Sequence, residues 1–316
     1  MNKLTRVFIG TALSLIAAAA GLPAHAQTVA PPTSLIPTAN TVSFTQGVTY
    51  QNITRSVLFI HPSASSSTKA PILIMLHGSG GSPIDIANNT RAGSLAAQMG
   101  YWVILPPQAN DEWNINAANT ADTVDDVGFL KTLIQTAVAQ YPVDATRISV
   151  TGMSEGGFMA MRMACDASSL LASVSAVAAE MITPEVKLCL PSRPLPTLYV
   201  MGTADPVVPY GGNSTFDGAL NAFNVWAGFN ACNTQKNVVT ALPIVVNDGT
   251  SVTLQHNAAC TSRGETDLYI VQNGGHAWPG GTQAGTTGPN GLVSGNLNAT
   301  QTIGSFSSLW NTGSTI

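Results

Sequence analysis

Three residue types that act together in nucleophilic catalysis each follow an apolar run of this sequence. Ser154 is the central residue of a G-x-S-x-G motif, which lies between a β-branched run and a segment of helical character. Asp205 follows the apolar run 196–201, and His276 follows the run 268–271. A serine hydroxyl needs an adjacent base to become a good nucleophile, and an imidazole base needs a carboxylate to orient it. The sequence therefore predicts that Ser154 is the nucleophile, Asp205 the orienting acid and His276 the base.

His276 and Asp205 are chosen as base and acid because each follows a predicted strand of a parallel sheet. A catalytic base is expected in a loop at the carboxyl end of a strand, and glycines on both sides let the His276 ring reach the serine. A surface histidine in a mobile loop is the alternative interpretation. Asp217, Asp248 and Asp267 are rival acids, but none of them directly follows a buried apolar run, and Asp217 is typical of a helix start.

The negative charge that develops on an attacked carbonyl oxygen needs two backbone N–H donors. One is expected from Glu155, the residue after the nucleophile, whose side chain points elsewhere. The other is expected from the glycine-rich turn 76–81, with Ser79 as the preferred donor and Gly80 as the second choice. In the same turn, His77 is expected to brace the backbone by a hydrogen bond and not to transfer protons.

Two tryptophans, Trp113 and Trp278, lie in segments close to these residues. They are candidates for an aromatic wall that binds substrate. The equally weighted alternative is that they cap the hydrophobic core beside the site.

Strand-like and helix-like segments alternate along the chain, which predicts an α/β fold with a mostly parallel central sheet and helices on both faces. Segments 84–99, 122–139 and 216–229 are predicted helices, and 268–271 is predicted to be the last strand. The segment 280–298 is predicted to be a flexible loop that borders the site. Only about 20 residues separate the strands at 171–177 and 196–201, too few for a large cap domain, so an open site is expected.

The N-terminus has the pattern of a secretory signal peptide, residues 1–26, with a short basic region, an apolar run and a small-x-small cleavage site ending at Ala26. A membrane anchor is the alternative, but the run is short and Pro23 interrupts it. Residues 27–40 are predicted to be a flexible leader and 41–316 a single catalytic domain. The protein is therefore expected to be secreted, either to the periplasm or outside the cell, without a membrane span.

Charged residues make up only 9% of the chain, with 12 Lys and Arg against 16 Asp and Glu. Because no basic cluster is visible, nucleic acid is not an expected partner. The four cysteines suit an exported protein with two disulfides. Three pairings are possible. Sequential pairing, Cys165 with Cys189 and Cys232 with Cys260, closes the shortest loops and is preferred over free buried thiols. No cysteine or histidine pair has metal-ligand spacing, so no metal and no cofactor are expected.

The sequence resembles the secreted esterases grouped with polyhydroxybutyrate depolymerases and feruloyl esterases. Five segments carry the resemblance: 76–81, 124–130, 152–157, 202–210 and 274–281. The resemblance implies the α/β-hydrolase fold, a Ser154–Asp205–His276 triad and ester hydrolysis through an acyl-enzyme, and it supports the sequential disulfides. Members of the family differ in substrate, which is polyhydroxyalkanoate, feruloylated or acetylated polysaccharide, or in some cases poly(aspartic acid).

These observations together predict a secreted serine hydrolase that cleaves carboxylic esters of a polymeric or bulky aromatic substrate. The first alternative is a polyamide hydrolase that uses the same residues on poly(aspartic acid), which a positive groove beside Ser154 would favour. The second is a non-catalytic binding protein on a hydrolase scaffold.

Overall fold

The computed structural model describes residues 34–64, 68–116, 124–260 and 263–313. The predicted signal peptide and the first part of the predicted leader lie outside the described residues. The end of that leader is fixed and not flexible, because the Ile36 N–H donates to Asn88 Oδ1 at 2.8 Å and Asn88 Nδ2 donates to the Ser34 carbonyl at 3.0 Å.

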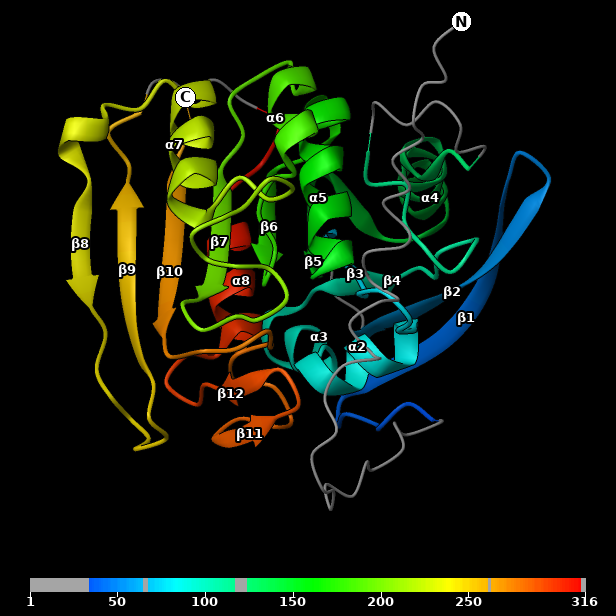
Figure 1. The fold of residues 1–316 in the computed structure, drawn as a ribbon. Coiled ribbons are helices and arrows are strands. Elements are labelled where there is room, and N and C mark those ends of the chain that lie inside the picture. The colour runs from blue at the N-terminus through cyan, green and yellow to red at the C-terminus, as the bar shows by residue number, and fades with distance from the viewer. Residues whose placement is uncertain (1–33, 65–67, 117–123, 261–262, 314–316) are drawn as a thin grey trace, which may run out of the picture. The chain divides into compact units, whose positions relative to one another are not determined.

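A twisted ten-stranded sheet in the order β1-β2-β4-β3-β5-β6-β7-β10-β9-β8 forms the centre of the fold (Figure 1). The central strands run parallel: β4 (Trp102–Leu105), β3 (Ala70–Leu76), β5 (Val143–Met153), β6 (Ser173–Val177), β7 (Thr197–Gly202) and β10 (Thr266–Gln272). The outer strands are antiparallel to their neighbours: β1 (Thr41–Tyr50), β2 (Ile53–Pro62), β9 (Ser251–Asn257) and β8 (Val238–Ala241). The predicted mixed, mostly parallel α/β fold is confirmed.

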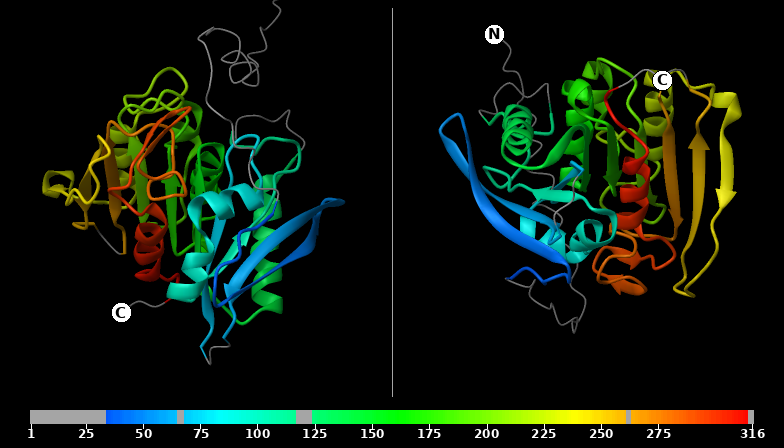
Figure 2. Two further views of the ribbon diagram at one scale, coloured as in Figure 1. Left: turned by 90° about the horizontal axis from the view of Figure 1, so that it is seen from below. Right: turned by 180° about the vertical axis from the view of Figure 1, so that it is seen from behind.

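Helices cover both faces of the sheet, because its central strands are apolar on both sides (Figure 2). Every residue of β4, β6 and β7 is buried. One face packs against α4 (Asp126–Gln140), α5 (Glu155–Asp166) and α7 (Ala219–Phe229), through side chains such as Phe129, Met159 and Phe223. The other face packs against α2 (Pro83–Thr90), α3 (Gly93–Met99) and α8 (Ala299–Ser308), through side chains such as Leu95 and Ile303.

Short elements connect this framework. Between β6 and β7 the chain forms only α6 (Thr183–Leu188) and no cap domain. A small second sheet consists of β11 (Thr286–Gly288) and β12 (Gly291–Val293). Two single turns of 3-10 helix, η2 (Ser168–Leu170) and η3 (Thr234–Lys236), complete the regular elements of the described residues.

Three local predictions are wrong. The single helix expected over 84–99 is two helices, since Arg91 adopts a left-handed conformation with φ 56° and caps the end of α2. Residues 268–271 are not the last strand, because β11 and β12 follow. The segment 280–298 contains those strands, and its backbone is tied to the His276 loop by hydrogen bonds described below.

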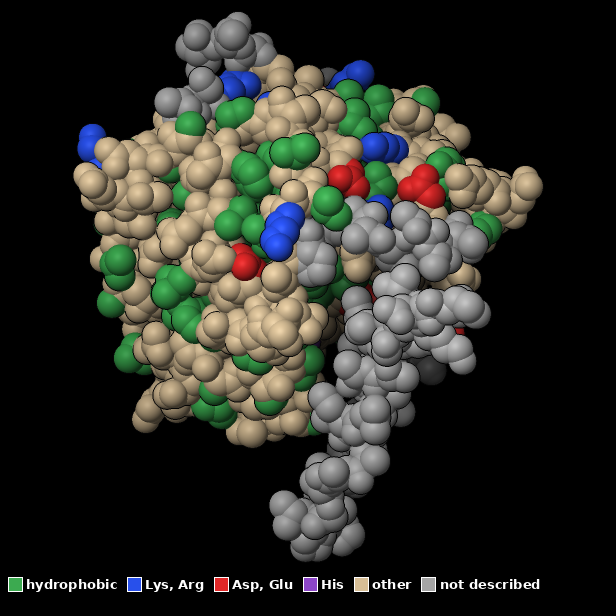
Figure 3. Space-filling model, turned by 45° about the horizontal axis from the view of Figure 1, so that its top comes forward, with side chains coloured by type: hydrophobic (Ala, Val, Ile, Leu, Met, Phe, Trp, Pro, Cys, Tyr) green, Lys and Arg blue, Asp and Glu red, His purple; other side chains and the backbone are tan. Residues whose placement is uncertain are grey.

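The structure pairs Cys165 with Cys189 and Cys232 with Cys260, the same sequential pairing as the prediction. Within the described residues, no helix has the length and apolar character needed to cross a bilayer. The face shown in Figure 3 is mostly uncharged, and its Lys and Arg side chains are scattered and not gathered into a basic patch.

Candidate active site

Ser154 lies on a sharp turn between the end of β5 and the start of α5. Its backbone has φ 54° and ψ −125°, a combination that residues with a side chain seldom adopt. Such strain costs on the order of 1–3 kcal/mol and persists only where the surroundings enforce it. Here the Ser154 N–H donates to the Val177 carbonyl at 2.9 Å, and its own carbonyl accepts from the Phe158 N–H at 3.0 Å. The turn therefore holds the serine at the carboxyl edge of the sheet.

Glycines make this turn possible by allowing α5 to approach the strands closely. A Cβ on Gly152 would lie 2.2 Å from the Gly156 carbonyl oxygen, and a Cβ on Gly156 would lie 2.2 Å from the Leu76 carbonyl oxygen. Real Cβ atoms do not approach other atoms so closely, so both positions of the motif require glycine.

Asp205 and His276, which are 71 residues apart in sequence, meet at the same edge. Their side chains are joined by a 2.8 Å contact between His276 Nδ1 and Asp205 Oδ2, and both are buried. The other carboxylate oxygen, Asp205 Oδ1, accepts the N–H groups of Val207 and Val208 at 2.8 and 2.9 Å. Because both oxygens are occupied, the carboxylate cannot rotate, and it selects the tautomer in which Nδ1 carries the proton. The other ring nitrogen, Nε2, is then the basic one.

The rival acids do not contact His276. Asp217 accepts from Asn221 Nδ2 near the start of α7. Asp248 binds the side chain of Thr250 and the N–H of Gly295, and Asp267 pairs with His256. Within the described residues, the Ser154 hydroxyl makes no hydrogen bond to the imidazole; such contacts often form only when substrate binds.

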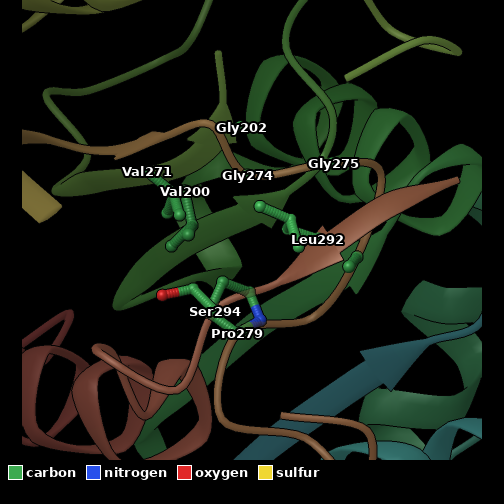
Figure 4. Close-up of a pocket in the computed structure, with 9 residues that line it drawn as sticks. Val200, Gly202, Val271, Gly274, Gly275, Pro279, Leu292 and Ser294 are labelled. Atoms are coloured by element: carbon green, nitrogen blue, oxygen red, sulfur yellow. The ribbon is translucent and has the colours of Figure 1, made fainter. Parts of the chain in front are cut away.

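The loop that carries His276 is held in place by the segment predicted to be mobile. The N–H groups of Gly275 and His276 donate to the carbonyls of Leu292 and Asn290, both at 2.9 Å. Figure 4 shows the small pocket beneath this loop, where Val200 of β7, Val271 of β10 and Leu292 of β12 face one another. The β12 strand thus acts as a support for the histidine.

The glycine-rich turn after β3 passes directly beside the nucleophile. A Cβ on Gly78 would lie 3.2 Å from Ser154 Cβ and 3.8 Å from Ser154 Oγ. The next residue in the turn is Ser79, the preferred oxyanion donor. Glu155, the other expected donor, is the first residue of α5, and the first N–H groups of a helix have no partner within it. Glu155 thus follows Ser154 directly, and Ser79 follows the glycine that passes beside it.

His77 is buried, and its Nδ1 donates to the Gly78 carbonyl at 2.9 Å, so it braces this turn. Burial lowers the pKa of His77 and keeps the ring neutral.

Neither predicted tryptophan lines a substrate wall. Trp113 and Trp278 are only 2% and 1% exposed. Each indole N–H has an acceptor inside the protein. Trp278 Nε1 donates to Thr300 Oγ1 at 2.9 Å. Trp113 Nε1 donates to the His77 carbonyl at 2.9 Å, and its backbone N–H donates to Glu155 Oε1 at 3.0 Å. The alternative, that these residues cap the core, fits the structure.

Trp113 nevertheless has a position that sequence reasoning missed. It connects the side chain of Glu155 with the backbone of His77, so it bridges the two segments that carry the expected oxyanion donors. Burial raises the pKa of Glu155 to about 7, although the bond from the Trp113 N–H favours its ionised form. The loop is fixed further by Arg162 Nη1, which donates to Asn114 Oδ1 at 2.6 Å.

Replacing Trp113 by Phe keeps an aromatic ring but removes the indole N–H and part of the ring volume, and it leaves the His77 carbonyl without that partner. An unsatisfied buried acceptor costs about 1–3 kcal/mol. If this strain loosens the Gly78–Ser79 turn, kcat is expected to fall about tenfold with little change in KM. The matched control is Tyr101→Phe, which also deletes a buried bond to a carbonyl, that of Gly304 at 2.8 Å, but far from the turn. Equal kcat in the two variants would show that Trp113 supports stability alone.

Glu180 is a second residue that the sequence did not single out. It follows β6, is fully buried, and accepts the Gly218 N–H at 2.9 Å. Burial, with further contributions from Asp217 and Asp205, raises the pKa of Glu180 to about 8. The carboxyl group is therefore mostly neutral at pH 7, and it holds the loop that runs from Asp205 to α7.

Comparison with known proteins relates part of this chain to a family of esterases. Residues 55–188 match the family described as Esterase PHB depolymerase, a stretch that contains the glycine-rich turn and the Ser154 elbow. The match covers less than half of the chain. Asp205 and His276 lie beyond the matched stretch, so their pairing is an observation of the structure.

Three curated proteins are similar in sequence to this chain. The chain is 27% identical to "Putative esterase NocK" of Nocardia uniformis subsp. tsuyamanensis, over 67% of this chain and 66% of that protein. It is 34% identical to feruloyl esterase B of Neurospora crassa, over 31% and 35% of the two chains. It is 31% identical to the poly(3-hydroxybutyrate) depolymerase of Ralstonia pickettii, over 55% and 35%. The chain thus spans between about a third and two thirds of the length of these curated relatives.

Among solved structures, the acetyl xylan esterase from Aspergillus awamori superposes with a TM-score of 0.56 at 15% identity. The match covers 74% of this chain and 94% of that one. At this identity, the likeness concerns the fold.

Proposed function

We propose that the protein is a secreted serine esterase that cleaves carboxylic ester bonds through an acyl-enzyme. The observation that carries the proposal is the buried contact between His276 and Asp205 at the sheet edge where the elbow holds Ser154. The match of residues 55–188 to the esterase family model and the names of the similar proteins support the reaction type.

The first half of the reaction forms the acyl-enzyme. Ser154 Oγ attacks the ester carbonyl while His276 Nε2 takes its proton, and Asp205 stabilises the imidazolium that results. The N–H groups of Glu155 and Ser79 bind the oxyanion. The C–O bond to the alcohol then breaks, and His276 returns the proton to the leaving oxygen.

In the second half, water replaces the alcohol. His276 takes a proton from the water, the hydroxide attacks the acyl carbon, and the proton returns to Ser154 as the acid leaves. These steps need no metal or cofactor, and each proton passes through the same imidazole nitrogen.

The substrate is proposed to be polymeric or bulky, of the polyhydroxyalkanoate or feruloyl-polysaccharide type. Two observations support this choice. First, only α6 stands between β6 and β7, so no cap domain covers this side of the elbow. Second, the elbow that holds Ser154 lies at the carboxyl edge of the sheet, where the strands of the described residues end in loops and not in a further domain.

The polyamide alternative is less well supported because acidic groups surround the elbow. Burial is the main cause of the raised pKa of Glu155 and of Glu180, and charge on Glu112 and Asp126, or on Asp217 and Asp205, adds to it. A negative surrounding of this kind repels poly(aspartic acid). Secretion is supported by the two disulfides, which form in oxidising compartments.

An organophosphonate that phosphonylates activated serines tests the reaction type. We expect one label per chain, on the peptide that contains Ser154, together with complete loss of p-nitrophenyl ester hydrolysis. Product release from feruloylated arabinoxylan, 3-hydroxybutyrate oligomers and poly(aspartate), measured side by side, then decides the substrate. A label on another serine, or release from poly(aspartate) alone, would contradict the proposal.

A further inference from the structure

A histidine and two carboxylates gather on one face of the sheet, away from the candidate active site. His256 of β9 lies directly opposite Asp267 of β10 in the antiparallel register. Glu265 precedes Asp267 by two residues, so its side chain leaves the same face of the chain. Because β10 rises about 3.3 Å per residue, Asp267 lies on the order of 15 Å from the strand end that leads to His276.

The three side chains already lie at distances close to those of metal ligands. His256 Nδ1 is 2.6 Å from Asp267 Oδ1 and 3.6 Å from Glu265 Oε1. One potential ligand atom from each residue lies within 4.8 Å of the other two. Tetrahedral zinc ligands, at about 2.0–2.2 Å from the ion, are roughly 3.3–3.6 Å apart. A small outward rotation of the His256 ring would give this spacing.

The charge balance of the cluster favours a cation. The side chains of Asp267 and Glu265 are only 7% and 16% exposed. Within the described residues, His256 is the only salt-bridge partner of either carboxylate, and neither carboxylate pairs with a Lys or Arg. Two carboxylates with limited access to water thus share one imidazole, and a divalent ion would neutralise both.

We propose that His256, Glu265 and Asp267 form a site for a divalent transition metal, with Zn²⁺ the best match. One imidazole nitrogen and two carboxylate oxygens suit Zn²⁺, whereas Ca²⁺ and Mg²⁺ prefer oxygen ligands alone. The His256 side chain is 32% exposed, so water can supply a fourth ligand. The ion would link β9 to β10 near the Cys232–Cys260 disulfide and stabilise this edge of the sheet. On binding through Nδ1, the ion takes the place of the proton on that nitrogen, and the neutral ring carries its proton on Nε2.

The test is calorimetric titration of the intact, tag-free and EDTA-treated protein with Zn²⁺. We expect one ion per chain and a higher Tm in the presence of Zn²⁺. His256→Gln keeps a polar side chain but removes the nitrogen ligand, and its Kd is expected to be at least about tenfold weaker. His61→Gln is the matched control, since His61 is a partly exposed histidine that stacks on Trp102 with no carboxylate beside it.

Absence of saturable binding, or equal Kd for wild type and His256→Gln, would overturn the proposal and leave the cluster as an ion pair. Circular dichroism of each variant confirms that it is folded. The result does not depend on ester hydrolysis, so it stands apart from the proposed function.

Discussion

Ser154→Ala is expected to lower kcat for a p-nitrophenyl ester by about a million-fold, because no other group can form the acyl-enzyme. Alanine tolerates the positive φ of residue 154 as well as serine does, so the fold and Tm should not change. The measurement is steady-state hydrolysis corrected for the reaction in buffer, with circular dichroism and thermal unfolding of the same samples.

A second substitution at this position separates catalysis from strain. Ser154→Gly is equally inactive but relieves the cost of the left-handed φ, so its Tm is expected to be several degrees higher than that of Ser154→Ala. Residual activity of either variant above a thousandth of the wild-type value would assign the nucleophile to another residue.

Asp205→Asn is expected to lower kcat by about 10⁴-fold, for a reason that follows from the hydrogen bonds of the carboxylate. The N–H groups of Val207 and Val208 will hold the carbonyl oxygen of the new amide. Its NH₂ group must then face His276 Nδ1, which can only accept from it. The proton therefore moves to Nε2, and the imidazole can no longer accept the Ser154 proton.

Matched controls for this result are Asp217→Asn and Glu180→Gln, which replace acids near the site that do not contact His276. Both are expected to keep kcat within about tenfold of wild type, because their bonds are to Asn221 and to the Gly218 N–H. The assignment of the acid would move to Glu180 if Glu180→Gln lost activity and Asp205→Asn kept it.

The sequence was sufficient to predict those site residues whose roles depend on their own chemistry and on their place after a strand. The apolar runs predicted a parallel sheet, and residues just after those runs meet at one edge because parallel strands end there together. The elbow was visible from its glycines, since close packing of α5 excludes any side chain at Gly152 and Gly156. The order of Ser154, Asp205 and His276 follows from the same topology.

Features that depend on tertiary contacts could not be predicted. The residue at which α2 ends, Arg91, is neither glycine nor proline, and the helical pattern continues past it. The role of Trp113 arises from contacts with His77 and Glu155, which are far away in sequence. The segment 280–298 is held in place by backbone hydrogen bonds to the His276 loop. Its composition alone indicates a flexible loop. Glu180 had a weak signal, because it follows a buried apolar run as Asp205 does.

The disulfides bear on how this protein can be produced. Cys165 lies near the end of α5, the helix that begins after Ser154, and its bond to Cys189 closes a loop with a sequence separation of 24. Closing such a loop contributes about 3 kcal/mol, a large share of the 5–15 kcal/mol typical of a folded domain. Expression in a reducing cytosol is therefore expected to give low yields and aggregated material. Export to an oxidising compartment, or refolding with a thiol–disulfide couple, should recover the protein.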